Sequence, residues 1–310
     1  MAERGGGEPR TRPFPFPGGQ APRTPRGPGP GARGPAAWAL ALPPVAVLGL
    51  VFLYPLALVL RQSVSPDGGG FSLSAYGDVL AQTAFREALA NTVLIAAGAT
   101  LGAVVLGFAL ALVIAFVPFP GGKALSRFVD VFLSFPSFLI TLALLFVYGT
   151  AGMANGLWTG ATGAAHGPFD FLHTPWGVLL AEVTYFTPFV MRPLLAAFSQ
   201  VETAQLEAAA SLGATAPRIV RRVILPEALP SLAAGGSLVL VMCLNEFGIV
   251  LFTGAKGVTT LPTLVYGKAI LDGDYTGACV VAVVNIALSV ALYGLYRSIT
   301  SLNGVRRARA

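Results

Sequence analysis

The sequence predicts an all-α membrane protein with six transmembrane helices. Of its 310 residues, 55% are apolar and only 11% are charged, which is far from the composition of soluble proteins. The apolar residues form six runs, each long enough to supply the roughly 20 helical residues that cross a hydrocarbon core. Because lipid offers no hydrogen bonds to the backbone, runs of this length fold as helices. The six runs are Ala36–Leu60, Ala88–Val117, Phe128–Gly149, Trp176–Phe198, Leu229–Phe252 and Tyr275–Ile299.

The chain begins with a tail, residues 1–35, that is rich in Gly, Pro and Arg. This tail has too little to bury to offset the entropy lost on folding. We therefore expect a disordered cytoplasmic tail, followed by the first transmembrane helix over residues 36–61. That apolar run is too long for the core of a secretory signal peptide, so we expect it to remain as a membrane anchor.

The main transmembrane domain is expected over residues 88–299. Its third span contains Pro136, which should kink the helix, and nearby serine hydroxyls could bond the carbonyl that the proline leaves free. The fourth and fifth spans carry Glu182 and Glu246, and an unpaired carboxylate in lipid is costly. Asn245–Gly248 is therefore either part of a substrate path or a break in the helix. Residues 300–310 form a basic cytoplasmic tail.

The 20 Lys and Arg residues are distributed unevenly among the connecting segments. If the N-terminus is cytoplasmic, 16 of them fall on the inner side. The positive-inside rule then places both termini and residues 200–228 of this multi-pass protein in the cytoplasm. Only Arg61, Arg86, Lys256 and Lys268 lie on the outer side. We expect both lysines to be solvated in loops, although they could also attract an anionic ligand.

Several functions are disfavoured by the remaining polar residues. The basic residues flank the spans and form no patch interleaved with aromatics, so no nucleic-acid partner is expected. Cys243 and Cys279 fall inside spans, and His166 and His173 lie in a loop without further metal ligands. Gly254–Thr260 has the residue types of a phosphate loop without the order G-x-x-x-x-G-K-[ST]. We predict no catalytic, cofactor or metal site in this chain.

A polar hairpin separates the fourth and fifth spans. Gln205–Ser211 reads as a short helix, Gly213 allows a tight turn, and Thr215 is placed to cap a second helix. One interpretation is an amphipathic loop on anionic lipid headgroups, for which the arginines at 218, 221 and 222 would suffice. That interpretation leaves the fixed spacing of the glutamate, alanines and glycine unexplained.

The spacing of this hairpin resembles the signature loop of permease subunits of bacterial binding-protein-dependent ABC importers. The pattern is E-A-A-x-x-x-G, followed after nine residues by V-x-L-P, where the family usually has Ile in place of Val. The residues that match are Glu207, Ala208, Ala209, Gly213, Val223, Leu225 and Pro226. Further segments are similar to permeases assigned to 2-aminoethylphosphonate uptake. These include Val117–Gly121, Phe138–Leu142, Met191–Leu194 and Asn245–Phe252.

The resemblance implies the type I, MetI-like permease fold and a set of partners. The loop would dock on a cytoplasmic ABC ATPase dimer, which binds the ATP and Mg that this chain does not hold. A periplasmic solute-binding protein would deliver the solute, and a second permease subunit, the same or related, would complete the path in the lipid. The implied solute is 2-aminoethylphosphonate, with polyamine, sulfate or ferric iron as alternatives. An ion-coupled secondary transporter is a further alternative, although no inverted repeat is visible.

Six polar or aromatic residues in the spans are candidates for the translocation path. Glu246 could pair with the ammonium group of the solute in transit. However, a Glu-Phe-Gly or Glu-Tyr-Gly element also occurs in relatives that move sulfate or ferric iron, which favours structural pairing across the permease interface. The candidates are Glu246, Asn245, Tyr185, Phe189, Ser137 and Thr141.

Overall fold

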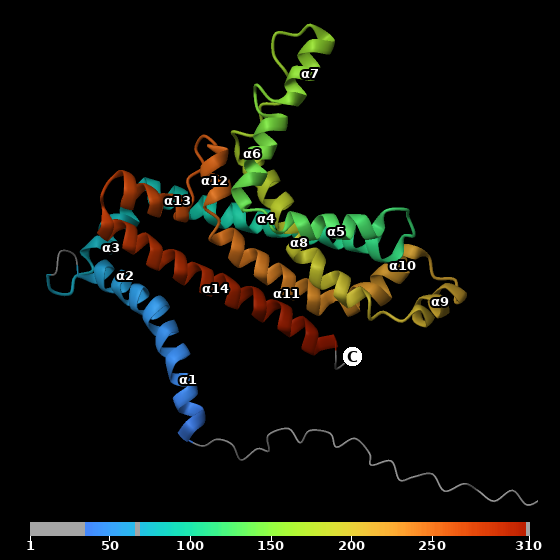
Figure 1. Ribbon diagram of the computed structural model, residues 1–310, viewed down its shortest axis with the longest axis horizontal. Helices are drawn as coiled ribbons and strands as arrows, with labels where there is room; N and C mark the ends of the chain where they lie inside the picture. Colours follow the sequence, from blue (N-terminus) through green and yellow to red (C-terminus); the bar gives the residue numbers. More distant parts are fainter. Residues whose placement is uncertain (1–34, 66–68, 308–310) are drawn as a thin grey trace, which may run out of the picture. The chain divides into compact units, whose positions relative to one another are not determined.

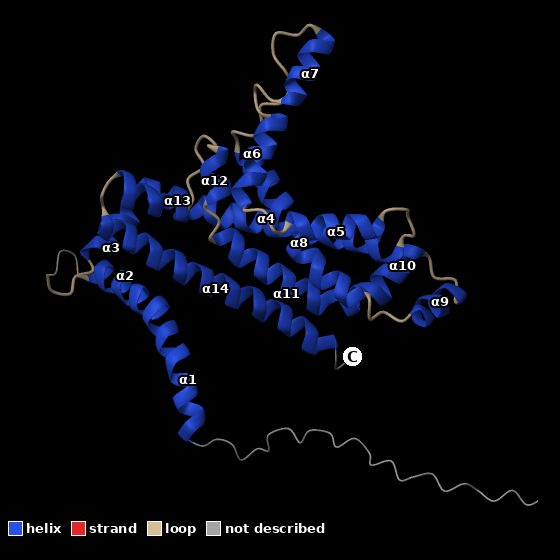
Figure 2. Cartoon of the chain, viewed as in Figure 1, coloured by secondary structure: helices blue, strands red, loops and turns tan. Residues whose placement is uncertain are grey.

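The computed structural model describes residues 35–65 and 69–307, except for the side chains of residues 35–41, 123, 130 and 301–307. All regular structure in this part of the chain is helical (Figure 2). The chain divides into two compact units, residues 1–55 and 56–310, and each is described by itself. The predicted disordered tail lies outside the described residues up to residue 34.

The first unit contains α1 (Pro35–Leu48), a π-helical segment (Gly49–Leu53) and the start of α2 (Tyr54–Val64). In the π segment the turn is widened, and the Tyr54 N–H bonds to the Gly49 carbonyl. Pro55 follows directly; it has no N–H, and its ring would clash with the carbonyl four residues earlier in a regular α-helix. The large apolar side chains from Leu42 to Tyr54 are exposed, as expected for a helix that faces lipid.

Four long helices form the core of the second unit: α4 (Thr83–Phe116), α8 (Pro175–Phe198), α11 (Leu225–Leu244) and α14 (Tyr275–Arg307). Figure 1 shows them lying alongside one another. Helix α4 packs against α8 and α11, and α11 also packs against α8 and α14. Their largest buried cluster is centred on α8, with Phe186, Met191 and Leu194 fully buried. Helix α14 continues to Arg307, so most of the predicted tail 300–310 is helical.

Glycines set the close approach of α4 and α8. A Cβ atom at Gly102 would lie 2.5 Å from Val183 Cγ2, and one at Gly107 would lie 3.0 Å from Val190 Cβ. Gly98 faces the end of the Leu179 side chain in the same way. These small residues let two backbones approach closely, which replaces the hydrophobic driving force that is missing between helices in lipid.

Short helices cover the two ends of this core. At one end, α3 (Ser74–Ala81), α13 (Leu261–Tyr266) and a π segment (Gly267–Leu271) lie near the start of α4 and α14 (Figure 1). They enclose a second buried cluster that includes Val79, Phe85 and Leu261. At the other end of the long helices lie α9 (Thr203–Ser211) and α10 (Ala216–Ile219).

The third predicted span is not one helix. The predicted run Phe128–Gly149 covers the end of α5 (Gly122–Phe132) and the whole of α6 (Ser137–Tyr148), and α7 (Met153–Thr162) follows beyond it. The prediction that Pro136 kinks a continuous helix is wrong, because the helix ends at Phe132 and Pro136 is the N-cap of α6. A proline without an N–H is well tolerated where a helix begins. The corner between α6 and α7 is closed by Asn155, whose amide donates to the carbonyls of Gly149 and Phe169 at 2.9 and 2.7 Å.

The described residues include six helical stretches long and apolar enough to cross a membrane, which confirms the predicted number of spans. The third begins nine residues later than predicted, at Ser137 instead of Phe128. The fifth includes α10 and begins before α11. The six stretches are Leu42–Val64, Thr83–Phe116, Ser137–Thr162, Pro175–Phe198, Ala216–Leu244 and Tyr275–Thr300.

Candidate functional site

The first candidate region is the hairpin formed by residues 203–224, which we call the coupling hairpin. Helix α9 ends in a Schellman motif: the Ala214 N–H bonds to the Ala209 carbonyl, and the Gly213 N–H bonds to the Ala210 carbonyl. Gly213 has φ +78°, in the left-handed region that favours glycine. No atom outside its neighbours lies within 4 Å of the position of a Cβ, so the requirement for glycine here is conformational and not a lack of space.

One face of the coupling hairpin packs on the core, and the other is exposed. Leu206, Ile219 and Val220 pack against the main buried cluster, and Ile224 is part of it. Exposed residues include Glu207, Ala208 and Gly213 of the predicted docking pattern, while Ala209 is half-buried. Leu212, at the tip, is 89% exposed. The structure therefore presents the predicted residues of α9 and its turn on a free surface, together with an apolar side chain that sequence reasoning had not singled out.

The return from the hairpin to the membrane is one uninterrupted helical stretch. Helix α10 continues through a π segment (Val220–Ile224) into α11, and the Leu225 N–H bonds to the Val220 carbonyl across the widened turn. Pro226 follows two residues after the π segment, the same spacing as Pro55 after Leu53. Val223 and Leu225 are half-buried, and Pro226 is exposed in the first turn of α11. Thr215 occupies the predicted N-cap position, but its side chain makes no capping hydrogen bond.

The second candidate region is the place where two broken helices meet, which we call the break junction. It comprises residues 133–137, between α5 and α6, and residues 245–248, between α11 and α12 (Gly248–Thr253). The sequence left Asn245–Gly248 as either part of a substrate path or a break in the helix, and the structure shows a break there. Ser134 and Phe135 on one side, and Asn245 and Glu246 on the other, make only short i to i−3 backbone bonds. The regular helix ladders therefore stop at both sides of the junction.

Glu246 links the two sides of the break junction. Its Oε1 atom accepts a hydrogen bond from Ser137 Oγ at 2.9 Å and one from the Ile249 N–H at 2.9 Å. The second bond satisfies a backbone donor in the first turn of α12. Glu246 thus has two hydrogen-bond partners within its own chain, and the expected pairing across a permease interface stays a prediction.

The other predicted path residues separate into two groups. Tyr185 packs against the buried cluster that includes Ile249 and Val250 of α12, and its ring contacts the ring of Phe189, with centroids 5.8 Å apart. Ser137 and Glu246 lie in the break junction, Tyr185 lies beside α12, and Phe189 lies one turn further along α8. Asn245 points elsewhere: its amide reaches Ser289 Oγ at 3.3 Å, and it accepts from Asn285 on α14 at 3.1 Å. Thr141 is buried in α6.

Sequence reasoning missed several buried polar residues of the spans. Asn285 and Ser289 of α14 form the partner surface of Asn245, and only their polarity within an apolar run could have indicated them. Buried side-chain atoms of Thr100, Thr141, Glu182 and Asn285 have no hydrogen-bond partner among the described residues. Such groups are costly in a membrane core, and here they lie on four different helices, α4, α6, α8 and α14.

Lys268 differs from the prediction of a solvated loop lysine. It lies in the π segment that follows α13, its side chain is only 9% exposed, and its Nζ is 3.0 Å from Asp274 Oδ2. Asp274 Oδ1 also accepts from the Gly277 N–H at 2.8 Å and so caps the start of α14. This backbone bond, and secondarily Lys268, holds the pKa of Asp274 below its ordinary value although partial burial opposes the shift. A lysine whose charge is paired with a carboxylate attracts an anionic ligand only weakly.

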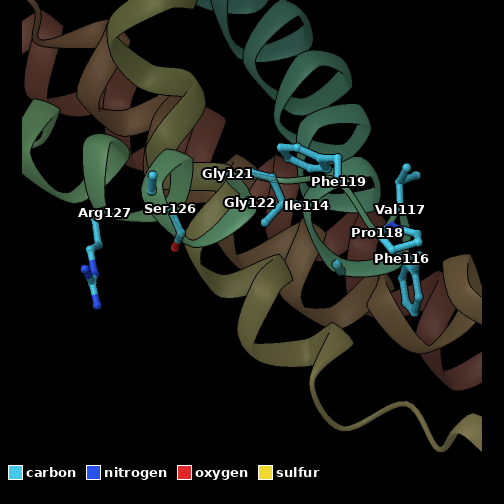
Figure 3. Close-up of a pocket in the computed structure, with 11 residues that line it drawn as sticks. Ile114, Phe116, Val117, Pro118, Phe119, Gly121, Gly122, Ser126 and Arg127 are labelled. Carbon is cyan, nitrogen blue, oxygen red and sulfur yellow. The ribbon is translucent and has the colours of Figure 1, made fainter.

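A shallow groove of about 820 Å³ lies where α4 turns into α5 (Figure 3). It is lined by the end of α4, the turn after it and the first residues of α5, with Phe119 beside Gly122 and with Arg127 and Ser126 at its polar edge. No residue of the predicted docking pattern or translocation path is among its lining residues. The groove therefore adds no support to either predicted site.

Known proteins resemble this chain both in sequence and in fold. Residues 74–301 match the family model of the binding-protein-dependent transport system inner membrane component. A permease assigned to 2-aminoethylphosphonate transport in Salmonella choleraesuis, PhnU, is 49% identical over 88% of this chain and 94% of its own. A permease assigned to sulfate transport in Chlorella vulgaris, cysT, is 32% identical over 76% of this chain and 80% of its own.

Among solved structures, a bacterial ABC transporter involved in import of the polysaccharide alginate has a similar fold. The TM-score is 0.74 at 18% identity, covering 86% of this chain and 95% of the other. At that identity the likeness concerns the fold alone, and the fold is that of an ABC importer membrane subunit. The relatives are transport subunits and not enzymes. With its family match covering most of the sequence, the chain belongs to the inner membrane components of binding-protein-dependent transport systems.

Proposed function

We propose that this chain is the membrane-spanning permease of an ATP-driven importer of 2-aminoethylphosphonate. The observation that carries the solute assignment is the 49% identity to PhnU over 88% of the chain. Relatives assigned to other solutes are more distant, with 32% identity for the sulfate permease cysT and 26% for the spermidine and putrescine permease PotC. These identities favour the phosphonate over the alternative solutes.

The mechanism that we propose needs no covalent chemistry in this chain. ATP and Mg bind to a cytoplasmic ATPase dimer, and its closure moves the coupling hairpin, whose exposed face carries Glu207, Ala208 and Gly213. A periplasmic binding protein supplies the solute, and a second permease copy or a related one completes the path. The free outer face of the hairpin and its packed inner face support this arrangement, because a docking element needs one surface for its partner and one for its own helices.

We further propose that both termini and the coupling hairpin face the cytoplasm. The excess of Lys and Arg on that side supports this orientation. In it, the break junction lies between the hairpin and the outer surface, so that Glu246, Tyr185 and Phe189 are positioned along a path through the membrane. The solute would pass these residues by weak contacts, as alternating access requires.

The test uses proteoliposomes that contain the permease, its ATPase and its binding protein. We expect uptake of labelled 2-aminoethylphosphonate that requires internal ATP and external binding protein, with no effect of an imposed ion gradient alone. Gly213→Val and Glu207→Lys should abolish uptake without loss of protein from the membrane. Uptake driven by the gradient without ATP, or preferential uptake of sulfate or spermidine in competition, would contradict the proposal.

A further inference from the structure

At the break junction, the N-termini of two half-helices meet at one carboxylate. Helix α6 begins at Ser137 and α12 begins at Gly248. The first residue of α6 donates its hydroxyl to Glu246 Oε1, and the second residue of α12 donates its N–H to the same oxygen. Helix N-termini carry partial positive charge and unpaired N–H groups. Glu246 therefore satisfies a backbone N–H at the start of α12, binds the side chain of the first residue of α6, and so joins the two helix starts.

Apolar packing extends this contact away from Glu246. The rings of Phe138 and Phe252 stack with centroids 5.2 Å apart. A Cβ at Gly248 would lie 3.3 Å from Phe138 Cβ and 3.4 Å from Ser137 Oγ, so the start of α12 lies directly against the start of α6. Figure 1 shows α6 and α12 side by side. The two helices are thus in contact from the hydrogen bond to the far end of α12.

The backbone before each of these two helices is irregular. Neither α6 nor α12 continues the hydrogen-bond ladder of the helix before it, because residues 133–136 and 245–247 interrupt it. Pro136 has no N–H to donate to a helix hydrogen bond, and Gly248 has no side chain to restrict the backbone at the second break. Interrupted ladders are the places where helices change direction most easily.

We propose that Glu246 is a positioning residue that keeps α6 and α12 joined as one element throughout the transport cycle. The inference rests on the proposed function, since it assigns Glu246 a role in ATP-driven uptake. Glu246 acts through Ser137 and the backbone of Ile249, and it need not touch the solute.

A cross-link across the contact tests whether α6 and α12 stay together. Phe138→Cys with Gly248→Cys, in a background with Cys243→Ala and Cys279→Ala, places two Cβ atoms about 3.3 Å apart, near the range that a disulfide needs. We expect oxidation to leave at least about half of the ATP-driven uptake of the reduced protein. Uptake that is lost on oxidation and restored by a reductant would show that the helices separate, and would overturn the proposal.

A series of substitutions tests whether the hydrogen bonds to Glu246 hold α6 and α12 together. Glu246→Ala should lower the maximal rate of uptake by roughly tenfold or more and Ser137→Ala by roughly threefold, with little change in the half-saturating concentration of loaded binding protein. Glu246→Gln keeps an accepting oxygen without the charge and should fall between wild type and Glu246→Ala. Ser134→Ala is the matched control: this serine is exposed in the same break, and its replacement should have no effect.

A rescue experiment distinguishes a role of Glu246 in joining α6 to α12 from a role in binding the solute. The oxidised Phe138→Cys/Gly248→Cys disulfide should restore at least about a third of the uptake lost in Glu246→Ala, because a covalent bond replaces the missing one. If Glu246 instead holds the solute, the disulfide will restore nothing, and the proposal fails. Wild-type uptake measured in parallel tests the proposed function separately. If wild type does not import 2-aminoethylphosphonate, the same comparisons are made on the ATPase activity that the binding protein stimulates.

Discussion

At the scale of single residues, three residues act at helix ends. Glu246 accepts from the first turn of α12, and Asp274 accepts from the first turn of α14. Gly213 ends α9 with a left-handed backbone. In lipid or at its edge, an unsatisfied backbone donor is costly, so these residues determine where helices begin and end. Two of the three also make a side-chain bond to another helical segment, Ser137 of α6 or Lys268 of the π segment.

Asp274 provides a prediction about pH. Asp274→Asn removes the partner of a lysine that is only 9% exposed, although Asp274 itself is 43% exposed and partly screened by solvent. We expect a loss of about 1–2 kcal/mol of stability at pH 7. Because the pKa of Asp274 is lowered in the folded protein, its contribution is complete above the unfolded value of about 4. It is lost as the pH falls through the lower folded value.

The measurement is thermal unfolding in detergent of wild type and Asp274→Asn at pH 7 and below pH 4. The difference between them should shrink in acid. Asp272→Asn, an exposed neighbour, serves as the control and should match wild type at both values. A difference that is equal at both pH values would contradict the assignment of the stabilisation to the ionised carboxylate.

Leu212 provides a prediction about docking. A leucine that is 89% exposed at the tip of the coupling hairpin has the character of an anchor for a pocket on a partner. Leu212→Asp should weaken binding of the ATPase by roughly thirtyfold or more, and Leu212→Ala by less. Co-purification from membranes measures the binding, with Ser211→Ala as the control. Normal co-purification of Leu212→Asp would show that the ATPase does not use this side chain.

At the scale of elements, the helices depart from regular α-helical geometry in two different ways. Before Pro55 and Pro226, a π segment widens the helix by one residue and the helix continues. At the break junction, the helix stops and a new one starts in another direction. The first kind keeps a long helix continuous, and the second produces a local joint. A proline is present at three of these four places, so the surrounding packing and not the proline alone decides which occurs.

The close contact of α4 and α8 leads to a prediction about packing. Gly102→Leu would force atoms into Val183, whose branched side chain has little freedom to move. We expect destabilisation of about 1–3 kcal/mol, measured by thermal unfolding in detergent, with partial rescue by Val183→Ala. Gly294→Leu on α14 has open space and is the matched control. Equal effects at both glycines would show that helix propensity, and not the contact, is responsible.

At the scale of the whole molecule, the number of spans, and a break at Asn245–Gly248 as one of two alternatives, could be predicted from sequence, because hydropathy and polarity within a span are local properties. The break between α5 and α6 inside the predicted third span could not, because Pro136 is equally compatible with a kink and with a helix start. The burial of Lys268 was missed as well. Its partner, six residues away, becomes a neighbour only because a π segment and a turn bring the chain back on itself.

The coupling-hairpin pattern was recognised in sequence because its spacing is fixed. The path residues were recognised only as a set of polar or aromatic positions. Ser137 and Glu246 lie in the break junction and Tyr185 packs beside α12, whereas Phe189 lies one turn further along α8 and Asn245 bonds to α14. Near a break, the direction in which a side chain points depends on how far the irregular turn rotates the helix. No periodicity in the sequence specifies that rotation.

The orientation of the molecule in the membrane leads to a labelling prediction. In a background without cysteine, a single cysteine at His166 should react with a membrane-impermeant maleimide added to intact spheroplasts. A single cysteine at Ser211, which is also exposed, should react only after the membrane is opened. This outcome follows from the distribution of Lys and Arg. Reversed labelling would place the coupling hairpin outside, where no ATPase could reach it.

The uninterrupted stretch Ala216–Leu244 has a mechanical consequence. Its 29 residues form a rod about 43 Å long, with the coupling hairpin at one end and Glu246 just beyond the other. A tilt of about 5° around its middle would displace each end by about 2 Å, in opposite directions. Such a rod acts as a lever. A small movement at the cytoplasmic tip is delivered to the break junction through one helix, with no loop in between to absorb it.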